Sequence, residues 1–228
     1  MPLYVVATPI GNLEDITLRA IRVLTEVDLI ACEDTRRTRI LLDRHGIQTP
    51  TTSYFEHNKL QKGPYLIGLL RDGKSVALVT DAGTPGISDP GFLLVRDARA
   101  EGIAVVPVPG PSAVTAALSA AGLPADRFVF EGFLPMRPGR RRARLERLRD
   151  SSLTAVLYES PHRIVATLEA IREVFGEVEV TLARELTKQF EEIVTAPVSA
   201  QLARVEKAGG GRGEFTVVVS PRGGREEE

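Results

Sequence analysis

Cysteine and histidine are scarce in this sequence, and that scarcity excludes whole classes of site. The single cysteine, Cys32, rules out an internal disulfide and any metal site built from several thiolates. The three histidines, His45, His57 and His162, stand far apart without ligand spacing, so we expect no structural metal ion. Sparse cysteine is also typical of a reducing compartment.

Long apolar runs are missing as well. None approaches the roughly 18 residues needed to cross a bilayer, and we expect no membrane partner. No basic region precedes the short apolar run near the N-terminus, so a signal peptide is a poor interpretation. With 43% hydrophobic and 26% charged residues, the composition is that of a soluble globular protein. We therefore expect a cytoplasmic protein.

Several common nucleotide-binding and hydrolase motifs are absent. The sequence contains no G-x-x-x-x-G-K-[ST] phosphate loop, and its glycine run at 209–211 lacks the G-x-G-x-x-G spacing and precedes a strand instead of a helix. It also lacks the G-x-S-x-G elbow of many hydrolases. ATPases, ordinary Rossmann dehydrogenases and the common hydrolases are thus disfavoured.

The net charge is only −1, which excludes a global field that would gather nucleic acid. The charge is nevertheless unevenly distributed, because 24 of the 29 basic residues are arginines and seven of these lie between Arg137 and Arg149. Such a cluster suits the binding of phosphates. The alternative is a solvated helix face balanced by Glu146 and Asp150.

Apolar runs alternate with segments of helical spacing along the whole chain. Strands are expected at 3–7, 29–32, 51–55, 75–80, 103–108, 127–133, 154–158, 178–183, 193–196 and 215–219. Helices are expected at 16–27, 35–44, 58–72, 91–101, 113–121, 161–175 and 199–207. For the helix at 161–175, Ser160 would be the cap and Pro161 would sit in the first turn. This alternation predicts an α/β fold with a mainly parallel sheet.

The clearest internal boundary is PVPGPS at 107–112, where three prolines in six residues exclude a helix interior or a central strand. We therefore expect an N-terminal lobe at 1–109 and a C-terminal lobe at 110–222. The remaining residues, 223–228, are glycine, arginine and glutamate, and we expect them to form a disordered tail.

The most informative stretch is VALVTDAGTPGISDPG at 76–91. Its apolar start reads as a buried strand, and Gly83, Pro85, Gly86 and Pro90 then predict a rigid open loop. Ligands of open α/β sheets bind at such strand ends, and glycines leave backbone N–H and C=O groups bare. The loop is thus expected to hold a small molecule. The alternative is a connection that only turns the chain.

Further polar loops follow the other apolar runs, at Thr8–Leu13, Glu33–Thr38, Pro109–Ser112, Glu159–Arg163 and Arg184–Lys188. If all the strands shared one parallel sheet, these loops would lie at one edge and converge on a single cleft. The same pattern would arise from loops that merely connect strands to helices in any α/β protein.

Eight short motifs occur in order over residues 1–220. They are VATPIGNL (6–13), EDTRRT (33–38), DAGTPGISDPG (81–91), PGPSA (109–113), FEGFLP (130–135), ESPHR (159–163), ARELTK (183–188) and GEFTVVV (213–219). Together they resemble the tetrapyrrole-methylase superfamily, and within it the bacterial branch that methylates the 2′-oxygen of a cytidine in 16S ribosomal RNA. The resemblance implies a two-lobed α/β fold, with a mainly parallel sheet in the N-terminal lobe and a mixed sheet in the C-terminal lobe.

The resemblance also implies S-adenosylmethionine as cofactor, in a cleft between the lobes, and usually a homodimer. By motif, Thr84 and Pro85 would form the cofactor loop, with Thr84 where many relatives carry aspartate. The other cofactor positions implied are Pro9, Gly86, Ile87, Ser112, Ala113, Tyr158, Ala183 and Glu214.

The reaction that this resemblance implies is an in-line displacement at the methyl carbon by a ribose 2′-oxygen. The protein then mainly needs to align the reacting atoms and help remove a proton. The candidate proton acceptors are Glu185, Lys188 and Asp34, with Glu185 ranked first. For each of them, the alternative is a salt bridge that holds its loop.

The substrate would be 16S ribosomal RNA within the small ribosomal subunit, bound through arginines on its phosphates. The arginines concerned are Arg36, Arg37, Arg39, Arg137, Arg140, Arg141, Arg142 and Arg144. RNA bases are read by stacking and edge contacts, for which Tyr54, Phe55, His57 and Phe133 are candidates.

Many family members carry a helical extension after the last strand, whereas this chain ends in RGGREEE. We therefore expect RNA affinity to depend more on the arginine cluster or on a dimer partner.

Two other functions fit parts of the sequence. A tetrapyrrole C-methyltransferase would keep the fold and cofactor, but the arginine cluster disfavours it because a porphyrin-like substrate needs an apolar cleft. A non-catalytic RNA-binding assembly factor would keep the fold without methyl transfer, and a failure to bind S-adenosylmethionine would favour that alternative.

Overall fold

The computed structural model describes residues 1–89 and 91–221. Pro90 and the predicted disordered tail at 223–228 lie outside the described residues. The chain divides into two compact units, Met1–Ser112 and Ala113–Glu228, which we call the N-terminal and C-terminal units and describe separately. The division into lobes at 109/110 predicted from the sequence differs from this by three residues, and the lobes as domains stay a prediction.

The N-terminal unit is built on a five-stranded sheet. Its spatial order is β3 (Thr51–Ser53), β2 (Leu29–Cys32), β4 (Val76–Leu78), β1 (Leu3–Val6) and β5 (Val105–Val108). All four neighbouring pairs are parallel, and β1 and β4 are aligned with Val5 opposite Leu78. The parallel sheet predicted for this part of the chain is confirmed.

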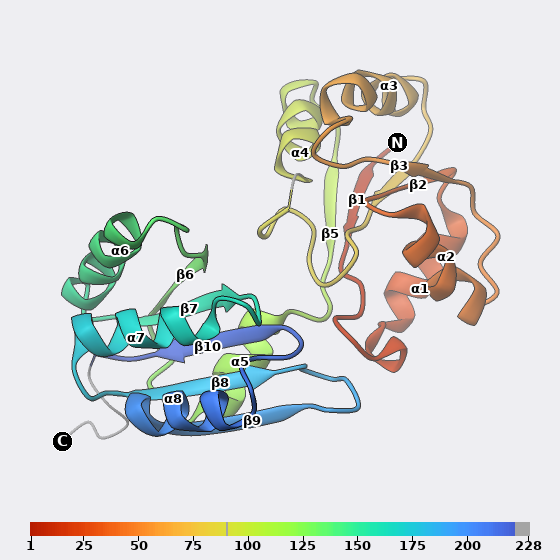
Figure 1. Cartoon of the computed structure of the whole chain (residues 1–228). Helices are drawn as coiled ribbons and strands as arrows, with labels where there is room; N and C mark the ends of the chain where they lie inside the picture. The colour runs from red at the N-terminus through yellow and green to blue at the C-terminus, as the bar shows by residue number, and fades with distance from the viewer. Residues whose placement is uncertain (90, 222–228) are drawn as a thin grey trace. The chain divides into compact units, whose positions relative to one another are not determined.

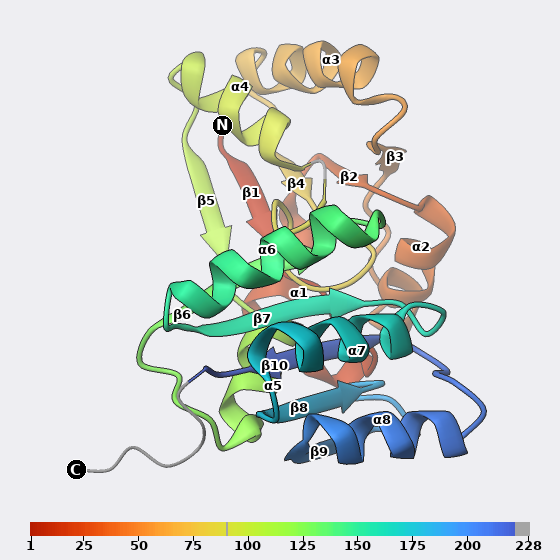
Figure 2. The ribbon, with the colours of Figure 1, turned by 60° about the vertical axis from the view of Figure 1, so that its left-hand side comes forward.

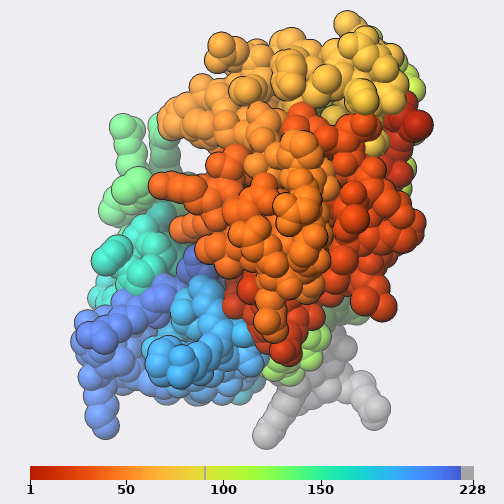
Figure 3. All heavy atoms as spheres, turned by 90° about the vertical axis from the view of Figure 1, so that its right-hand side faces the viewer, coloured from red at the N-terminus to blue at the C-terminus, as the bar shows by residue number. Residues whose placement is uncertain are grey.

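Helices cover both faces of this sheet (Figure 1). Helices α1 (Leu18–Glu26) and α2 (Thr35–Arg44) pack on one face, and α3 (Lys59–Arg71) and α4 (Gly91–Ala100) pack on the other. Alternate strand residues supply the two cores: Ala77 and Val79 pack with α1 and α2, whereas Val76 and Leu78 pack with α3 and α4. In Figure 3 the α1 and α2 face is closed by red and orange atoms.

Side-chain caps fix where two of these helices begin. The Thr17 hydroxyl accepts a hydrogen bond from the Ala20 N–H at the start of α1, and the Asp34 carboxylate accepts one from the Arg36 N–H at the start of α2. A short 3-10 turn, Leu13–Asp15, precedes α1. Because Asp34 directly follows β2, the cap fixes the connection at the carboxyl end of that strand.

The C-terminal unit has a mixed five-stranded sheet. Its spatial order is β6 (Phe128–Phe133), β7 (Thr154–Glu159), β10 (Phe215–Val219), β8 (Glu179–Arg184) and β9 (Glu192–Pro197). Strands β6 and β7 are parallel, and the other three pairs are antiparallel. The carboxyl ends of β6, β7 and β8 and the start of β10 therefore meet at one edge. The mixed sheet predicted here is confirmed.

Four helices cover this second sheet, as Figures 1 and 2 show. Helices α6 (Pro138–Asp150), α7 (Ile164–Phe175) and α8 (Val198–Lys207) share a core with one face of the sheet. Helix α5 (Ala113–Ala121) lies on the other face, where its Ala121 carbonyl accepts hydrogen bonds from the hydroxyls of Thr181 and Thr195. None of the helices within the described residues is long and apolar enough to span a membrane.

The predicted start of α7 is wrong by three residues. The chain first makes a turn at 161–163, in which the Ser160 carbonyl accepts hydrogen bonds from the N–H groups of Arg163 and Ile164. The buried Glu159 carboxylate causes this turn, because it accepts the Ser160 N–H and the Thr167 hydroxyl. Ser160 thus precedes a turn instead of capping the helix. The other predicted elements fall within about two residues of their expected ends, whereas α6 was not among the predicted helices.

Candidate functional site

Three connections meet at the carboxyl edge of the N-terminal sheet. Thr8, just after β1, forms a two-way backbone bridge with Gly83, with N–O distances of 2.9 and 3.0 Å. The Thr8 hydroxyl also donates to the Thr80 carbonyl at 3.0 Å. The Thr84 hydroxyl donates to the Pro111 carbonyl at 3.4 Å, which brings in the segment after β5. This part of the predicted cofactor site is therefore assembled within one unit.

The loop after β4 has the unusual backbone that its glycines predicted. Gly83 and Gly86 have φ values of 84° and 86°, in the left-handed region that favours glycine. A Cβ atom on Gly83 would lie 3.4 Å from Ile10 Cγ2 and 3.8 Å from the Pro111 carbonyl oxygen. The loop thus combines a left-handed backbone with close approach of two neighbouring segments.

One part of the bare-backbone prediction is wrong. The Gly86 N–H donates to both oxygens of the Asp89 carboxylate at 2.8 Å, and the Gly91 N–H donates to the same carboxylate at 2.7 Å. The Gly83 N–H is used by Thr8 and the Ile87 N–H by the Thr84 carbonyl. Asp89 therefore organises the loop from inside, and these four N–H groups are not free for a ligand.

The predicted cofactor residues of this unit occupy different environments. Pro9 and Pro85 are buried, Thr84 and Gly86 are half-buried, and Ile87 is 47% exposed. Ser112 directly follows Pro111, the residue that accepts the Thr84 hydroxyl. A small cavity of about 70 Å³ lies beside Pro9 and Thr80. The structure brings these positions together at one sheet edge.

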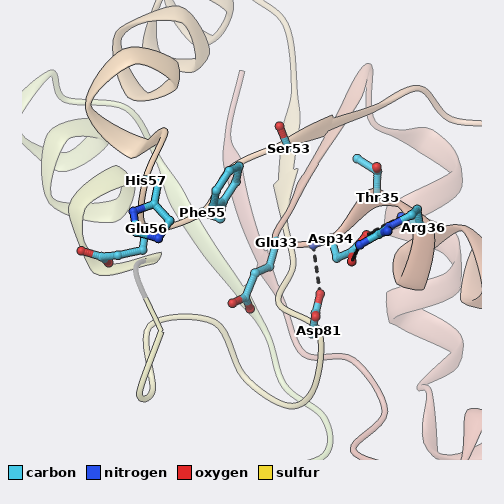
Figure 4. Close-up of a pocket in the computed structure, with 9 residues that line it drawn as sticks. All are labelled: Glu33, Asp34, Thr35, Arg36, Ser53, Phe55, Glu56, His57 and Asp81. Atoms are coloured by element: carbon cyan, nitrogen blue, oxygen red, sulfur yellow. Dashed lines mark hydrogen bonds and ion pairs between the residues drawn. The ribbon is translucent and has the colours of Figure 1, made fainter.

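A larger pocket of about 500 Å³ opens at the ends of β2, β3 and β4 (Figure 4). Its residues follow three neighbouring strands: Glu33–Arg36 after β2, Ser53 and Phe55–His57 at and after β3, and Asp81 after β4. The Asp81 carboxylate accepts the Asp34 N–H at 3.0 Å, which ties two of these connections together.

Asp81 has the most unusual carboxylate of this pocket. Burial raises its pKa, and the nearby Glu33 carboxylate acts in the same direction, although the Asp34 N–H and the Arg37 guanidinium at 3.2 Å partly oppose the shift. Asp81 lines both cavities of this edge. Its place directly after the apolar run 76–80 was the signal in the sequence, but the prediction of site residues missed it.

Asp34 is held as a helix cap. Its carboxylate accepts two hydrogen bonds from the Arg36 side chain, at 2.7 and 3.1 Å, and one from the Arg36 N–H. These contacts, the side-chain bonds first, lower the pKa of Asp34 to about 2. A carboxylate with so low a pKa is a weak proton acceptor, so the geometry favours the loop-holding alternative for Asp34.

The C-terminal unit gathers the other predicted residues at the edge where β7, β8 and β10 meet. Tyr158 and Ala183 flank Thr216 on opposite sides in the sheet. The half-buried Tyr158 ring makes edge contacts with Phe130 and Phe133, with centroids 4.9 and 5.8 Å away, and burial raises its pKa. Ala183 is buried, so any ligand contact would have to use its backbone.

Glu185, Lys188 and Glu214 form a closed charged cluster at this edge. Lys188 Nζ lies 2.8 Å from Glu185 Oε1 and 2.8 Å from Glu214 Oε2. Glu185 Oε1 also accepts the Glu214 N–H at 2.9 Å, and the Glu185 N–H donates to the Glu214 carbonyl at 3.0 Å. Three predicted site residues are thus brought into direct contact.

These contacts shift both protonation equilibria away from proton transfer. The hydrogen bond from Lys188, followed by that from the Glu214 N–H, lowers the pKa of Glu185. Burial by itself would lower the pKa of Lys188, but the hydrogen bonds to Glu185 and Glu214 outweigh it and raise that pKa. Glu185 remains a carboxylate and Lys188 an ammonium at neutral pH, an arrangement that favours the loop-holding alternative for both.

The backbone of this loop is strained. Glu185 and Thr187 have φ values of 51° and 66°, which are unusual for residues with a side chain. Gly213, with φ 81°, lies against Glu185, and a Cβ there would overlap the Glu185 side chain. The glycine of the GEF motif is therefore what leaves room for Glu185.

The arginine cluster lies on and beside α6. Leu145 and Leu148 are buried, whereas Arg142 pairs with Glu146 and Arg144 pairs with Glu131. Arg137 and Arg140 are exposed and form no ion pair with another described residue, and Arg141 is half-buried. In the N-terminal unit, Arg36, Arg37 and Arg39 pair with Asp34, Asp81 and Asp43. The solvated-face alternative therefore describes part of the cluster, while Arg137 and Arg140 stay available for phosphates.

The prediction that all the polar loops lie at one edge of a single sheet is wrong. The described residues form two sheets, so the loops form one set in each unit.

Among the aromatic candidates, Tyr54 is only 3% exposed and belongs to the core, whereas Phe133 is 55% exposed and Phe55 lines the large pocket. Within the ESPHR motif, Arg163 contacts Glu159 at 3.4 Å.

Two α/β units, a parallel sheet with a glycine-rich loop after β4 and a mixed sheet, define a class of fold that solved structures share. The crystal structure of a cobalamin biosynthetic enzyme, cobalt precorrin-4 methyltransferase, superposes with a TM-score of 0.71. It covers 95% of this chain and 94% of its own, with 18% identity, a level at which the likeness concerns the fold alone.

The sequence comparisons identify the family. Residues 2–201 match the model of the Tetrapyrrole (Corrin/Porphyrin) Methylases, so the chain belongs to this family. A protein of Mesorhizobium japonicum called ribosomal RNA small subunit methyltransferase I is 51% identical over 99% of this chain and 77% of its own. One of the same name in Pseudomonas aeruginosa is 55% identical over 86% of this chain and 70% of its own.

Proposed function

We propose that this protein transfers the methyl group of S-adenosylmethionine to the ribose 2′-oxygen of a cytidine in 16S ribosomal RNA of the small ribosomal subunit. The proposal rests on sequence similarity. Two proteins named ribosomal RNA small subunit methyltransferase I share about half of their aligned residues with this chain, over 99% and 86% of its length. The match to the Mesorhizobium japonicum protein covers 99% of this chain, so it is not confined to one sheet edge.

The residues of the N-terminal unit fit a methyl donor of this kind. Gly83 and Gly86 have left-handed backbone, and Thr84 and Pro85 lie between them beside Pro111. The Gly83, Gly86 and Ile87 N–H groups and the Gly83 and Thr84 carbonyls are used inside the protein, so in this proposal the Pro85 and Gly86 carbonyl oxygens face the donor. Carbonyl oxygens suit a cationic sulfonium and an ammonium, which carry positive charge. In this proposal Pro9, Ile87 and Ser112 complete that wall.

Tyr158, Ala113, Ala183 and Glu214 are proposed to contribute to the same cofactor from the C-terminal unit. Tyr158 offers an aromatic edge beside Phe133, and Ala183 offers backbone groups. Glu214 is held by Lys188 and by two backbone hydrogen bonds to Glu185. These residues would position a ligand and would carry out no chemical step.

The sulfonium of the bound donor supplies an electrophilic methyl carbon, so the chain has to align the ribose oxygen and accept its proton. Glu185, Lys188 and Asp34 are the acceptors predicted from sequence, but each is held by a salt bridge. We add Asp81, which also pairs with Arg37 but whose pKa burial nevertheless raises, and which lines both cavities at its sheet edge. A raised pKa makes a carboxylate a better proton acceptor.

RNA affinity is proposed to depend on the arginines, chiefly on the unpaired Arg137 and Arg140. Arginines in salt bridges must exchange a carboxylate for a phosphate, whereas unpaired ones do not. A second copy of the chain as a homodimer partner is part of this proposal, because it would add another set of arginines.

The proposal is tested by incubating the purified protein with small ribosomal subunits and labelled S-adenosylmethionine. Mass spectrometry of the RNA is expected to find one added methyl on the ribose of a cytidine. Deproteinised RNA in parallel shows whether the assembled particle is required. Methyl transfer to a base, or binding of S-adenosylmethionine without transfer to either RNA, would overturn the proposal. The absence of cofactor binding at millimolar concentration would favour a non-catalytic RNA-binding factor.

A further inference from the structure

The pocket in Figure 4 has a composition that the proposed catalytic and arginine sites do not explain. An aromatic ring, Phe55, and the exposed imidazole of His57 lie on one side, with ring centroids 6.1 Å apart and nearly perpendicular planes. Carboxylates of Glu33 and Asp81 lie below them in the same view. At about 500 Å³, the pocket is large enough for a nucleoside.

Glu33 is a carboxylate of this pocket that is anchored inside the protein and still has one oxygen to spare. Its Oε2 accepts a hydrogen bond from the Thr80 hydroxyl at 3.1 Å, which fixes the side chain. Its Oε1 has no hydrogen bond to another described residue. By contrast, both oxygens of Asp34 are used by Arg36, and this pair points away from Glu33 and Phe55 in Figure 4. Glu33 therefore presents an anchored and unused acceptor.

Two of the donors in the pocket wall are already committed. The Arg36 guanidinium is bound to Asp34, and the Asp34 N–H is bound to Asp81. The Ser53 hydroxyl accepts a hydrogen bond from the Asn58 side chain. The free oxygen of Glu33 suits a ligand that brings a hydrogen-bond donor, and the Phe55 ring suits a flat apolar face. The described residues contain no group of three or more His, Cys, Asp or Glu that could hold a metal ion.

We propose that this pocket receives the target base of the RNA, with the Phe55 ring as its stacking surface and the free oxygen of Glu33 as the acceptor for the exocyclic amino group of cytosine. The inference rests on the proposed function and supplies the base selection that the arginines cannot give. Carboxylates accept hydrogen bonds from cytosine N4, and aromatic rings stack on RNA bases. Uracil would place its O4 carbonyl against the carboxylate, two acceptors facing each other.

The test uses the full chain and small subunits reconstituted with three versions of the RNA. The nucleotide that mass spectrometry identifies as methylated carries cytosine, uracil or pyrimidin-2-one, which lacks the amino group. For the wild-type protein, kcat/KM is expected to fall about 10-fold or more for both replacements, given the usual discrimination by a matched base contact. Equal rates on cytosine and pyrimidin-2-one would overturn the proposal without any variant.

Three variants sharpen the assignment. Glu33→Gln is expected to bring the rates on cytosine and uracil within about threefold of each other, because an amide both donates and accepts. Phe55→Ala is expected to raise KM about 10-fold for every base, since stacking is sequence-tolerant. Glu26→Gln, an exposed carboxylate at the end of α1 paired with Arg22, is the matched control and is expected to change neither ratio.

Calorimetry separates this inference from the proposed function. All three variants are expected to bind S-adenosylmethionine as the wild type does. If wild-type protein methylates the subunits and Glu33→Gln keeps the wild-type preference for cytosine, the base pocket is wrong while the methyltransferase stands. If Glu33→Gln does not fold, Thr80→Val, which removes the hydroxyl that anchors Glu33, is expected to weaken the same preference. If wild-type protein transfers no methyl group at all, the proposed function is itself wrong, and the base pocket is overturned with it.

Discussion

The two units handle their polar residues in opposite ways. At the sheet edge of the N-terminal unit, Glu33 and Asp81 line a pocket, and Glu33 keeps an oxygen free of the described residues. At the corresponding edge of the C-terminal unit, Glu185, Lys188 and Glu214 are bonded to one another. Groups left open can bind a ligand, whereas groups that satisfy each other hold a loop. The comparison therefore favours the N-terminal unit for chemistry and the C-terminal cluster for support.

Backbone strain differs between the two edges as well. In the N-terminal loop Gly83 and Gly86 occupy left-handed conformations at little cost, and of the other loop residues with a described backbone only Ser88 has a positive φ. In the C-terminal loop the residues with positive φ include Glu185 and Thr187. Each such residue costs on the order of 1 kcal/mol, so the ionic cluster has to offset the strain.

The largest expected effect is on kcat, and it distinguishes a variant of the proposed proton acceptor, Asp81, from a variant of the charged cluster in the C-terminal unit. Asp81→Asn keeps an oxygen that can accept the Asp34 N–H but cannot take up a proton, so kcat is expected to fall by roughly 100- to 10,000-fold. Glu185→Gln keeps the acceptor for the Glu214 N–H and is expected to reduce kcat by less than about 10-fold. Single-turnover methyl transfer measures both. The reverse order of the two losses would restore Glu185 as the acceptor.

The pH dependence of Asp81 has a definite sign. Its pKa is raised in the folded protein, so protonation favours folding, and this contribution to stability is lost as pH rises from the unfolded pKa through the folded one. The Asp81→Asn variant is expected to lack that loss. In the wild type, the rate of methyl transfer is expected to fall as acid protonates Asp81. If the rate decreased in the same way at low pH in the wild type and in Asp81→Asn, the role given to Asp81 would be contradicted.

The next effect concerns the cofactor loop after β4. Gly86→Val places a branched side chain at φ 86°, and Thr84→Arg puts a long side chain beside Pro111, so each is expected to weaken S-adenosylmethionine binding about 100-fold or more in calorimetry. Because the loop lies outside the core, the circular dichroism spectrum should remain that of the wild type. Gly102→Val, with φ 67° and no atom near its Cβ, is the matched control for backbone strain. Loss of folding in Gly86→Val but not in Gly102→Val would make the loop structural.

Gly213 tests the closed cluster of the C-terminal unit. A Cβ at Gly213 would overlap Glu185, whereas Gly209, with a similar φ of 76°, has open space around it. Both alanine variants carry the backbone strain, so the difference between them isolates the displacement of Glu185. Gly213→Ala is expected to lower the free energy of unfolding by about 2 kcal/mol more than Gly209→Ala, as judged by urea denaturation. Equal losses would mean that Glu185 does not hold the loop.

The sequence predicted the fold far better than the contacts of the site. Alternating apolar runs and glycine stops located the strands and most helices, because periodicity and backbone conformation are local properties. Helix α6 was not predicted, because only Leu145 and Leu148 are apolar among its many charged residues. The start of α7 was missed because the buried carboxylate of Glu159 fixes a turn there, and its partner Thr167 lies eight residues away. The environments of the two aromatic residues after β3 could not be predicted from the local sequence either. Tyr54 is buried in the core, whereas its neighbour Phe55 lines the pocket.

Roles within the candidate site depended on partners that the sequence could not supply. Glu185 ranked first as a proton acceptor from its motif. Its pKa is lowered first by the hydrogen bond from Lys188, three residues on, and then by the Glu214 N–H, which lies 29 residues away. No role was predicted for Asp81, because its raised pKa comes from burial and from Glu33, which follows a different strand. Chain distance between interacting residues, more than any missing motif, limited the prediction of function.

The smallest expected effect sharpens a comparison within the arginine cluster itself. Arg140→Glu removes an exposed guanidinium that no described carboxylate neutralises, whereas Arg142→Glu removes one already paired with Glu146. We expect Arg140→Glu to weaken RNA binding about 10-fold at low salt and to reduce the slope of log Kd against log salt by about one, with a smaller change for Arg142→Glu. Filter binding of 16S RNA over a salt series measures both, and cofactor affinity serves as the control. Since a paired guanidinium must leave its carboxylate before it meets a phosphate, equal slopes for the two variants would mean that ion pairing on α6 does not govern which arginines contact RNA.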